Sequence, residues 1–356
     1  MTSLFSHGNE STTTFGTSKL VQYAFDYRQL LLPVYILYTI PSFIAYYKCR
    51  RFLSKASIGT SSFTLIFTND FMINVGLFII DFLFTRLPIS GLLVNLPNYV
   101  PEGIPAMLVY FLSYYLIYAN FYSITVICLN RMSAVVFPYS TNLFWQRNIG
   151  RAIFSIYLLP LLTTWQMFTY EPYFLPLYEN RSSYQMVYRT TVLVGLLPRN
   201  SMNLCFVSIL LSVVCVAANC ATIVKYKATM NSIDAAGGPT MSTVSGLEIR
   251  EEFLKKRRRR VEFAMFSVAL VVCFSLVFQA VLQALIMIYS SSSGSIRATC
   301  QDLRAFALDI AICCPPWILY YTTVHTNKLK ISTSSAVHSA VGAGAGAPPT
   351  KTHQMT

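Results

Sequence analysis

The sequence predicts an all-α membrane protein, a bundle of seven transmembrane helices with the N-terminus outside and the C-terminus inside. Two features carry this prediction: seven long apolar stretches, and basic residues gathered in alternate connections between them. Each stretch is close to the ~20 residues that cross a hydrocarbon core about 30 Å thick. The composition agrees, because only 12% of the residues are charged, against roughly 25% in a soluble domain.

The seven apolar stretches are read as helices because a backbone in lipid must satisfy its own N–H and C=O groups. The short alternating strands that are typical of a membrane barrel do not occur in the pattern. In chain order, the predicted spans are residues 30–48, 61–83, 105–129, 152–170, 201–224, 263–289 and 304–324. They define one transmembrane domain, residues 30–324.

The segments outside the spans have distinct compositions. Residues 1–29 are polar and rich in Ser and Thr, so we expect an extracellular tail without a cleaved signal peptide, and the first span must target the chain. Residues 234–246 are rich in Gly, Pro and Ser, as in a flexible loop, whereas 247–262 reads as a charged helix that continues into the sixth span. Residues 325–356 are of low complexity, and we expect a disordered cytoplasmic tail.

The orientation follows from the basic residues, because Lys and Arg near span ends are retained in the cytoplasm. The three alternate loops and the C-terminal tail hold 19 of the 27 Lys and Arg residues. Two glycosylation triplets, at Asn9 and Asn180, both fall on the opposite side, as an external location requires. We expect these asparagines to carry glycans, with unmodified loop residues as the alternative.

The strongest basic run precedes the sixth span and consists of Lys255, Lys256, Arg257 and Arg258 with the two arginines that follow. Here it would lie against the anionic inner leaflet of the lipid bilayer, with roughly 1 kcal/mol of attraction for each cation. A docking role for a cytoplasmic partner is compatible with this interpretation. The net charge of +13 therefore does not indicate nucleic acid as a partner.

The nine cysteines do not suggest a disulfide framework, because most of them fall within the spans. Many seven-helix receptors join the outer end of the third helix to the next outer loop by a disulfide. The region around Pro105 has no cysteine for such a bond.

The most specific motif closes the third span and consists of Asn130, Arg131, Met132 and Ser133, here called the Asn-Arg box, with Pro138 after it. It resembles the acidic-Arg-aromatic box of rhodopsin-like receptors, with Asn130 in the place of the usual acid. An arginine at this boundary can bridge neighbouring helix ends at rest and be released to meet a cytoplasmic partner. The alternative is an arginine that extends to the lipid headgroups.

A closer resemblance is to nematode serpentine receptors of class gamma. It rests on Tyr38, Pro41, Ser42 and Tyr46 in the first span, Ser62, Phe63, Phe67 and Asp70 in the second, the Asn-Arg box with Pro138 and Trp145, and Asp309 before a proline in the seventh. The resemblance implies a chemoreceptor-like G-protein-coupled receptor of rhodopsin-like architecture. It implies a plasma membrane location, with sensory cilia as a candidate compartment. It also implies a heterotrimeric G protein as partner and a small-molecule ligand that it does not identify.

Three aspartates lie inside spans, where a charge costs about 2.5–3.5 kcal/mol on insertion scales and is a functional candidate by default: Asp70, Asp81 and Asp309. We expect Asp81 to pair with Arg86. For Asp70, one interpretation is a polar bridge to Asn74 or Asn120, and the other is an activation-linked or sodium-like site.

A ligand pocket is expected to open outward between the third, fifth, sixth and seventh spans. Gln279 and Gln283 are four residues apart and share one helix face, which suits a small polar or amphipathic ligand. The alternative is that Asn and Gln side chains join helices in lipid. The candidate lining residues are Tyr110, Tyr114, Trp165, Gln166, Asn203, Gln279, Gln283 and Asp309.

Enzyme chemistry finds little support in the sequence. The four histidines are dispersed, and neither a His-Glu-x-x-His motif nor a Gly-rich phosphate loop occurs. We therefore expect no catalytic activity, no cofactor and no metal site. The alternative from another class is a small transporter or ion channel that uses the intramembrane Asp residues; internal symmetry would favour it, but the two halves show no repeat.

Overall fold

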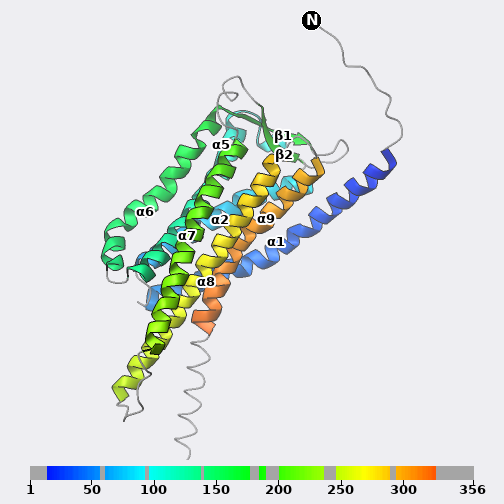
Figure 1. The fold of residues 1–356 in the computed structure, drawn as a ribbon. Coiled ribbons are helices and arrows are strands. Elements are labelled where there is room, and N and C mark those ends of the chain that lie inside the picture. Colours follow the sequence, from blue (N-terminus) through cyan, green and yellow to red (C-terminus); the bar gives the residue numbers. More distant parts are fainter. Residues whose placement is uncertain are drawn as a thin grey trace, which may run out of the picture.

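The structure is a computed structural model that describes residues 14–56, 61–92, 96–137, 140–176, 184–189, 200–235, 246–288 and 294–325. Long helices lie side by side and form one elongated bundle (Figure 1). The α-helices are α1 (Thr14–Ala56), α2 (Ser61–Asp81), α3 (Leu87–Ser90), α4 (Leu96–Tyr99), α5 (Ile104–Val136), α6 (Thr141–Thr164), α7 (Asn200–Ala235), α8 (Gly246–Ile288) and α9 (Gly294–Leu319). Shorter elements are the π-helical η1 (Phe82–Arg86) and η3 (Tyr320–His325), the 3-10 helix η2 (Trp165–Thr169), and the strands β1 (Glu171–Pro176) and β2 (Tyr184–Arg189).

Seven helical segments are long and apolar enough to cross a membrane, which confirms the predicted spans. They are Tyr27–Arg51, Ser62–Ser90, Ile104–Val136, Leu143–Thr169, Asn200–Ala228, Phe263–Ile288 and Asp302–Thr322. Two helices extend well beyond their spans. The first, α1, starts at Thr14, inside the segment expected to be a tail. The second, α8, runs unbroken from Gly246, which confirms the predicted helical approach to the sixth span.

The distribution of side chains is that of a protein whose surroundings are apolar. Large apolar side chains face outward, such as Leu37 at 75% exposure and Phe206 at 68%. Polar and charged side chains are buried inside the bundle, among them Asp70 of α2 and Asp309 of α9. Water would favour the reverse arrangement, whereas lipid favours this one.

The centre of the bundle is α5, which packs against α2, α6, α7 and α8. Its buried residues include Tyr118, Phe121 and Ile124, and these join Leu276 of α8 in the main apolar core. α5 thus contacts four of the other six spans.

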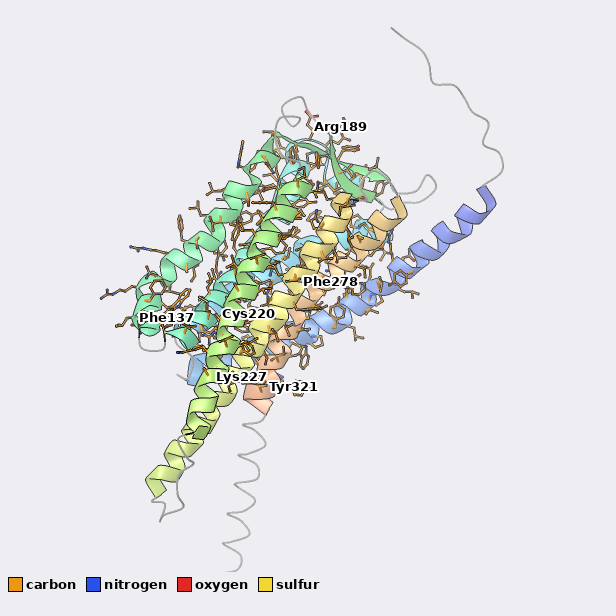
Figure 2. The ribbon with its side chains drawn as sticks, in the orientation of Figure 1. Phe137, Arg189, Cys220, Lys227, Phe278 and Tyr321 are labelled. Atoms are coloured by element: carbon orange, nitrogen blue, oxygen red, sulfur yellow. The ribbon has the colours of Figure 1, made fainter. Side chains whose placement is uncertain are left out.

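The sequence analysis did not predict the two strands. β1 and β2 form an antiparallel hairpin, in which Glu171 is opposite Arg189 and Pro176 is opposite Tyr184. The hairpin covers one end of the bundle, here called the hairpin end (Figure 1). Figure 2 shows Arg189 at this end, and Phe137 and Lys227 toward the opposite end, here called the far end.

Candidate functional site

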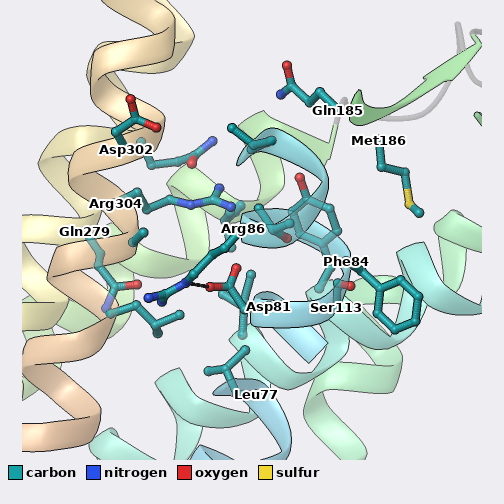
Figure 3. Close-up of a pocket in the computed structure, with 18 of the residues that line it drawn as sticks. Leu77, Asp81, Phe84, Arg86, Ser113, Gln185, Met186, Gln279, Asp302 and Arg304 are labelled. Carbon is teal, nitrogen blue, oxygen red and sulfur yellow. Dashed lines mark hydrogen bonds and ion pairs between the residues drawn. The ribbon is translucent and has the colours of Figure 1, made fainter. Parts of the chain in front are cut away.

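A cavity of about 140 Å³ lies within the bundle at the hairpin end (Figure 3). Its walls come from α1, α2 with η1 and α3, α5, α7, α8 and α9, and the hairpin residues Gln185 and Met186 contribute to it. The sequence analysis placed the pocket between four spans, and the cavity also involves the first and second. No described residue of α6 or η2 lines it.

Four of the predicted lining residues border the cavity: Tyr110, Tyr114, Gln279 and Gln283. The other candidates lie elsewhere, because α6 packs at the edge of the bundle against α2 and α5. Trp165 is 54% exposed on the outside, and Gln166 is buried outside the cavity lining. Asn203 donates a hydrogen bond to the carbonyl of Thr163 at 2.7 Å and so joins α7 to α6.

Asp309, also expected in the pocket, belongs to a buried ion cluster beside it. The Arg86 Nε donates to Asp81 at 2.6 Å, and both terminal nitrogens of Arg86 donate to Asp309 at 2.8 Å. The Tyr38 hydroxyl donates to the same Asp309 carboxylate, and the Arg86 guanidinium lies 4.3 Å from the ring centre of Tyr35. The structure contains the predicted Asp81–Arg86 pair. The sequence analysis did not predict that Asp309 is a second carboxylate partner of Arg86.

The local geometry of the second span explains how Asp81 reaches Arg86. Five residues on an α-helix turn about 500°, so the two side chains would point in directions about 140° apart. Instead, the helix widens into the π-helical turn η1 between them. A π-helix repeats at the fifth residue, which brings the pair to one side.

Two further arginines line the cavity. Arg28 of α1 forms an ion pair with Asp302 of α9 at 3.0 Å and so connects the first and seventh spans. Arg304 reaches into the cavity from α9 (Figure 3). Neither residue was singled out from the sequence, because both lie at predicted span ends where basic residues commonly face headgroups.

Stacked tyrosines hold the hairpin over the cavity. Tyr188 of β2 stacks on Tyr170, with ring centres 4.5 Å apart and planes at 10°, and it also meets Tyr110 of α5 at 5.9 Å. All nine cysteines are free thiols. The hairpin is thus held against the bundle by aromatic contacts and not by a disulfide.

We expect Tyr188→Ala to loosen the hairpin, because the stack contributes about 0.5–1.5 kcal/mol beyond the area it buries. The melting temperature of the purified protein is expected to fall by a few degrees, with faster proteolysis of the hairpin. Tyr99→Ala, which removes a tyrosine that is 80% exposed, is the matched control and should leave both unchanged. Equal effects of the two substitutions would refute the role of the stack.

A second polar cluster surrounds Asp70 in the middle of the bundle. Ser123 of α5 donates to one carboxylate oxygen at 2.7 Å, and Asn74 and Tyr46 donate to the other at 2.9 and 3.3 Å. Asn120 donates to Asn74 at 2.7 Å. Asp70 therefore contacts Asn74 directly and reaches Asn120 only through it, and the network connects the first, second and third spans.

The Asn-Arg box lies near the far end of α5, where Arg131 turns into the bundle and is only 9% exposed. Its guanidinium donates to Asn130 at 2.7 Å, contacts the sulfur of Met265 on α8, and lies 4.0 Å from the ring centre of Phe63 on α2. This inward position differs from an arginine extended to the headgroups.

The other residues singled out around this motif either contact neighbouring helices or lie outside the residues that the structure describes. Trp145 of α6 donates to the Ser133 hydroxyl at 2.7 Å, and Met132 packs against the main core. Lys255, Lys256, Arg257 and Arg258 lie on the helical extension of α8, although their side chains lie outside the described set. Pro138, Asn9 and Asn180 also lie outside the described residues.

Comparison with known proteins decides the family. The sequence matches the Srg family of chemoreceptors over residues 32–238 and 236–325, a match that starts within the first span and includes the other six. This chain belongs to the Srg chemoreceptor family. Over 178 residues it is 27% identical to serpentine receptor class gamma-20 of Caenorhabditis elegans, a match that covers 49% of this chain and 47% of that protein. The chain thus spans about half the length of this relative.

Membership of the Srg family and the seven spans establish a multi-pass membrane protein of the serpentine receptor type. The resemblance stated from the sequence is confirmed. The family is named for chemoreception and not for an enzymatic activity.

Proposed function

We propose that this Srg protein is a G-protein-coupled chemoreceptor that binds a small ligand in the hairpin-end cavity and engages a heterotrimeric G protein at the far end. The proposal includes the predicted orientation, with the hairpin end and the N-terminus outside. It places the receptor in the plasma membrane of a sensory cell, with the cilium as the expected compartment. Glycans on Asn9 and Asn180 belong to the same proposal.

The observation that carries this proposal is the course of α5. Tyr110 and Tyr114 near its start line the cavity, Ser123 in its middle contacts Asp70, and Arg131 near its end lies in the inward cluster. From Tyr114 to Arg131 the helix rises about 25 Å at 1.5 Å per residue. One rigid element therefore connects the proposed ligand site with the proposed partner site.

A second connection runs through α8. Gln279 and Gln283 line the cavity, and Met265 of the same helix contacts Arg131. A ligand that draws α8 toward or away from α5 changes the surroundings of Arg131. Such a two-position contact is the bistable element that a receptor switch requires.

The decisive experiment co-expresses the receptor with a panel of Gα biosensors and compares wild type with Arg131→Ala. At equal surface level, we expect the substitution to abolish constitutive or odorant-evoked activation, or to shift it by about tenfold or more. Arg147→Ala, which removes an exposed arginine of α6, is the control and should signal like wild type. Unchanged signalling in Arg131→Ala would remove the switch role.

The transporter alternative needs carboxylates that form one path. Asp70 and Asp81 are separated by about 16 Å along α2 and η1, and each is bonded within its own cluster. This separation favours the receptor. Current recordings from the same cells distinguish the two, because a flux sensitive to Asp70→Asn, without coupling to any Gα, would favour the transporter.

A further inference from the structure

The ion pairs in and beside the cavity are unevenly distributed. Its walls hold three arginines, Arg28, Arg86 and Arg304, and two aspartates, Asp81 and Asp302. Arg28 is paired with Asp302, and Arg86 is held by Asp81 and by Asp309 beside the cavity. Among the residues that the structure describes, no carboxylate lies within ion-pair distance of Arg304.

The position of Arg304 makes this uneven pairing significant. It lies near the start of the seventh span, Asp302–Thr322, about 7.5 Å along the helix from Asp309 at 1.5 Å per residue. Its side chain is partly buried, and its guanidinium is directed into the cavity (Figure 3). A cation inside a protein is stabilised by a counter-charge or by hydrogen-bond acceptors, and without them its transfer from water is costly. An arginine presents a planar fork that matches a carboxylate or sulfate.

An independent observation comes from Gln283, which lines the cavity and is only 4% exposed. Its Nε2 lies 3.4 Å from the carbonyl of Ser201, whereas its Oε1 is buried without a hydrogen-bond partner in the described part of the chain. Buried polar atoms nearly always have partners. An acceptor left open in a cavity wall is suited to an O–H or N–H donor of a ligand.

The remaining walls are apolar and aromatic. Leu31, Leu77, Ile117 and Phe121 line the cavity, with Tyr110 beside them. Such walls favour an apolar or aromatic body between the polar ends of a ligand.

From these contacts we infer that the cavity binds a small organic monoanion, in which a carboxylate or sulfate pairs with Arg304 and a hydroxyl or N–H group donates to Gln283. The inference rests on the proposed function, in that it assigns the ligand class of the same hairpin-end site. It gives Arg304 the role of ligand counter-charge, separate from the structural ion pairs of Arg28 and Arg86.

The test measures binding without signalling. Full-length receptor is placed in phosphatidylcholine nanodiscs, and its melting temperature is followed against a set of hydroxylated C6–C10 carboxylates and arylacetates, including 4-hydroxyphenylacetate, each beside its neutral carboxamide. We expect at least one carboxylate to stabilise the receptor and its carboxamide to bind about tenfold more weakly or not at all.

The variants assign the effect to Arg304. Arg304→Gln is expected to lower the affinity for the stabilising carboxylate at least tenfold, whereas Arg304→Lys should keep part of that affinity. Arg147→Gln makes the same change at an exposed far-end site and should leave the affinity unchanged. The inference is overturned if no carboxylate binds, if carboxamides bind equally, or if binding survives Arg304→Gln. Binding that depends on Arg304 without Gα activation in the biosensor panel would overturn the G-protein proposal and leave the ligand class in place.

Discussion

Replacing Arg86 with Met is expected to destabilise the receptor by about 3–5 kcal/mol and to remove most of it from the cell surface. The reason is that Asp81 and Asp309 both depend on this one guanidinium, and the Arg86 and Asp309 side chains are only 4% and 5% exposed. Removing one partner of a buried ion pair leaves an uncompensated charge, which costs much more than the pair contributes. Surface labelling and the melting temperature of the solubilised protein measure the two effects.

The matched control is Arg189→Met, because Arg189 also pairs with a carboxylate, that of Glu102 at 3.6 Å, but with both side chains about 60% exposed. An exposed pair contributes roughly 0–1 kcal/mol, so this variant should resemble wild type. A triple variant that adds Asp81→Asn and Asp309→Asn to Arg86→Met should regain part of the lost stability. If Arg86→Met alone were as stable as wild type, the cluster would not hold the bundle together.

The second large effect is expected from Asp70→Asn, which should change signalling about tenfold while surface expression stays close to wild type. The carboxylate accepts bonds from Ser123, Asn74 and Tyr46. An amide keeps the size but presents a donor to one of these groups, so the three helices must adjust their relative positions. Couplings between distant sites of 1–3 kcal/mol correspond to shifts of this order.

Constitutive and odorant-evoked Gα activation, normalised to surface level, measures the Asp70 effect. Glu102→Gln makes the same acid-to-amide change at a residue whose side chain is 63% exposed, and it should have no consequence. A loss of surface receptor in Asp70→Asn, rather than altered signalling, would indicate that the Asp70 cluster serves folding.

The helical framework was predictable because lipid imposes a strict rule on the sequence. Each crossing needs an uninterrupted apolar run, so hydropathy alone located all seven spans. The Asp81–Arg86 pair was also predictable, since two opposite charges close together near one span end favour pairing, although the π-helical turn that brings them to one side was not predicted. The helix ends were less predictable, because polar helical turns such as the start of α1 leave no hydropathy signal.

The remaining contacts depend on how the helices are rotated about their axes, which hydropathy does not determine. Arg86 and Asp309 are 223 positions apart. A signal for the pair was nevertheless present, because Asp309 lies in a span and a carboxylate in lipid requires a cation from another helix. Helix rotation also explains why some pocket residues were wrongly assigned. Trp165 and Asn203 lie at a suitable depth but do not line the cavity.

The length of α8 gives the receptor a lever arm. The helix is unbroken from Gly246 to Ile288, whereas the apolar span starts at Phe263. The 17 residues before Phe263 project about 25 Å from the span at 1.5 Å per residue, beside the shorter extension of α7 (Figure 1). A tilt of about 10° at Phe263 would thus displace the tip by about 4 Å by this geometry. A motion within the bundle too small to break its packing is thereby amplified into a displacement as large as a side chain.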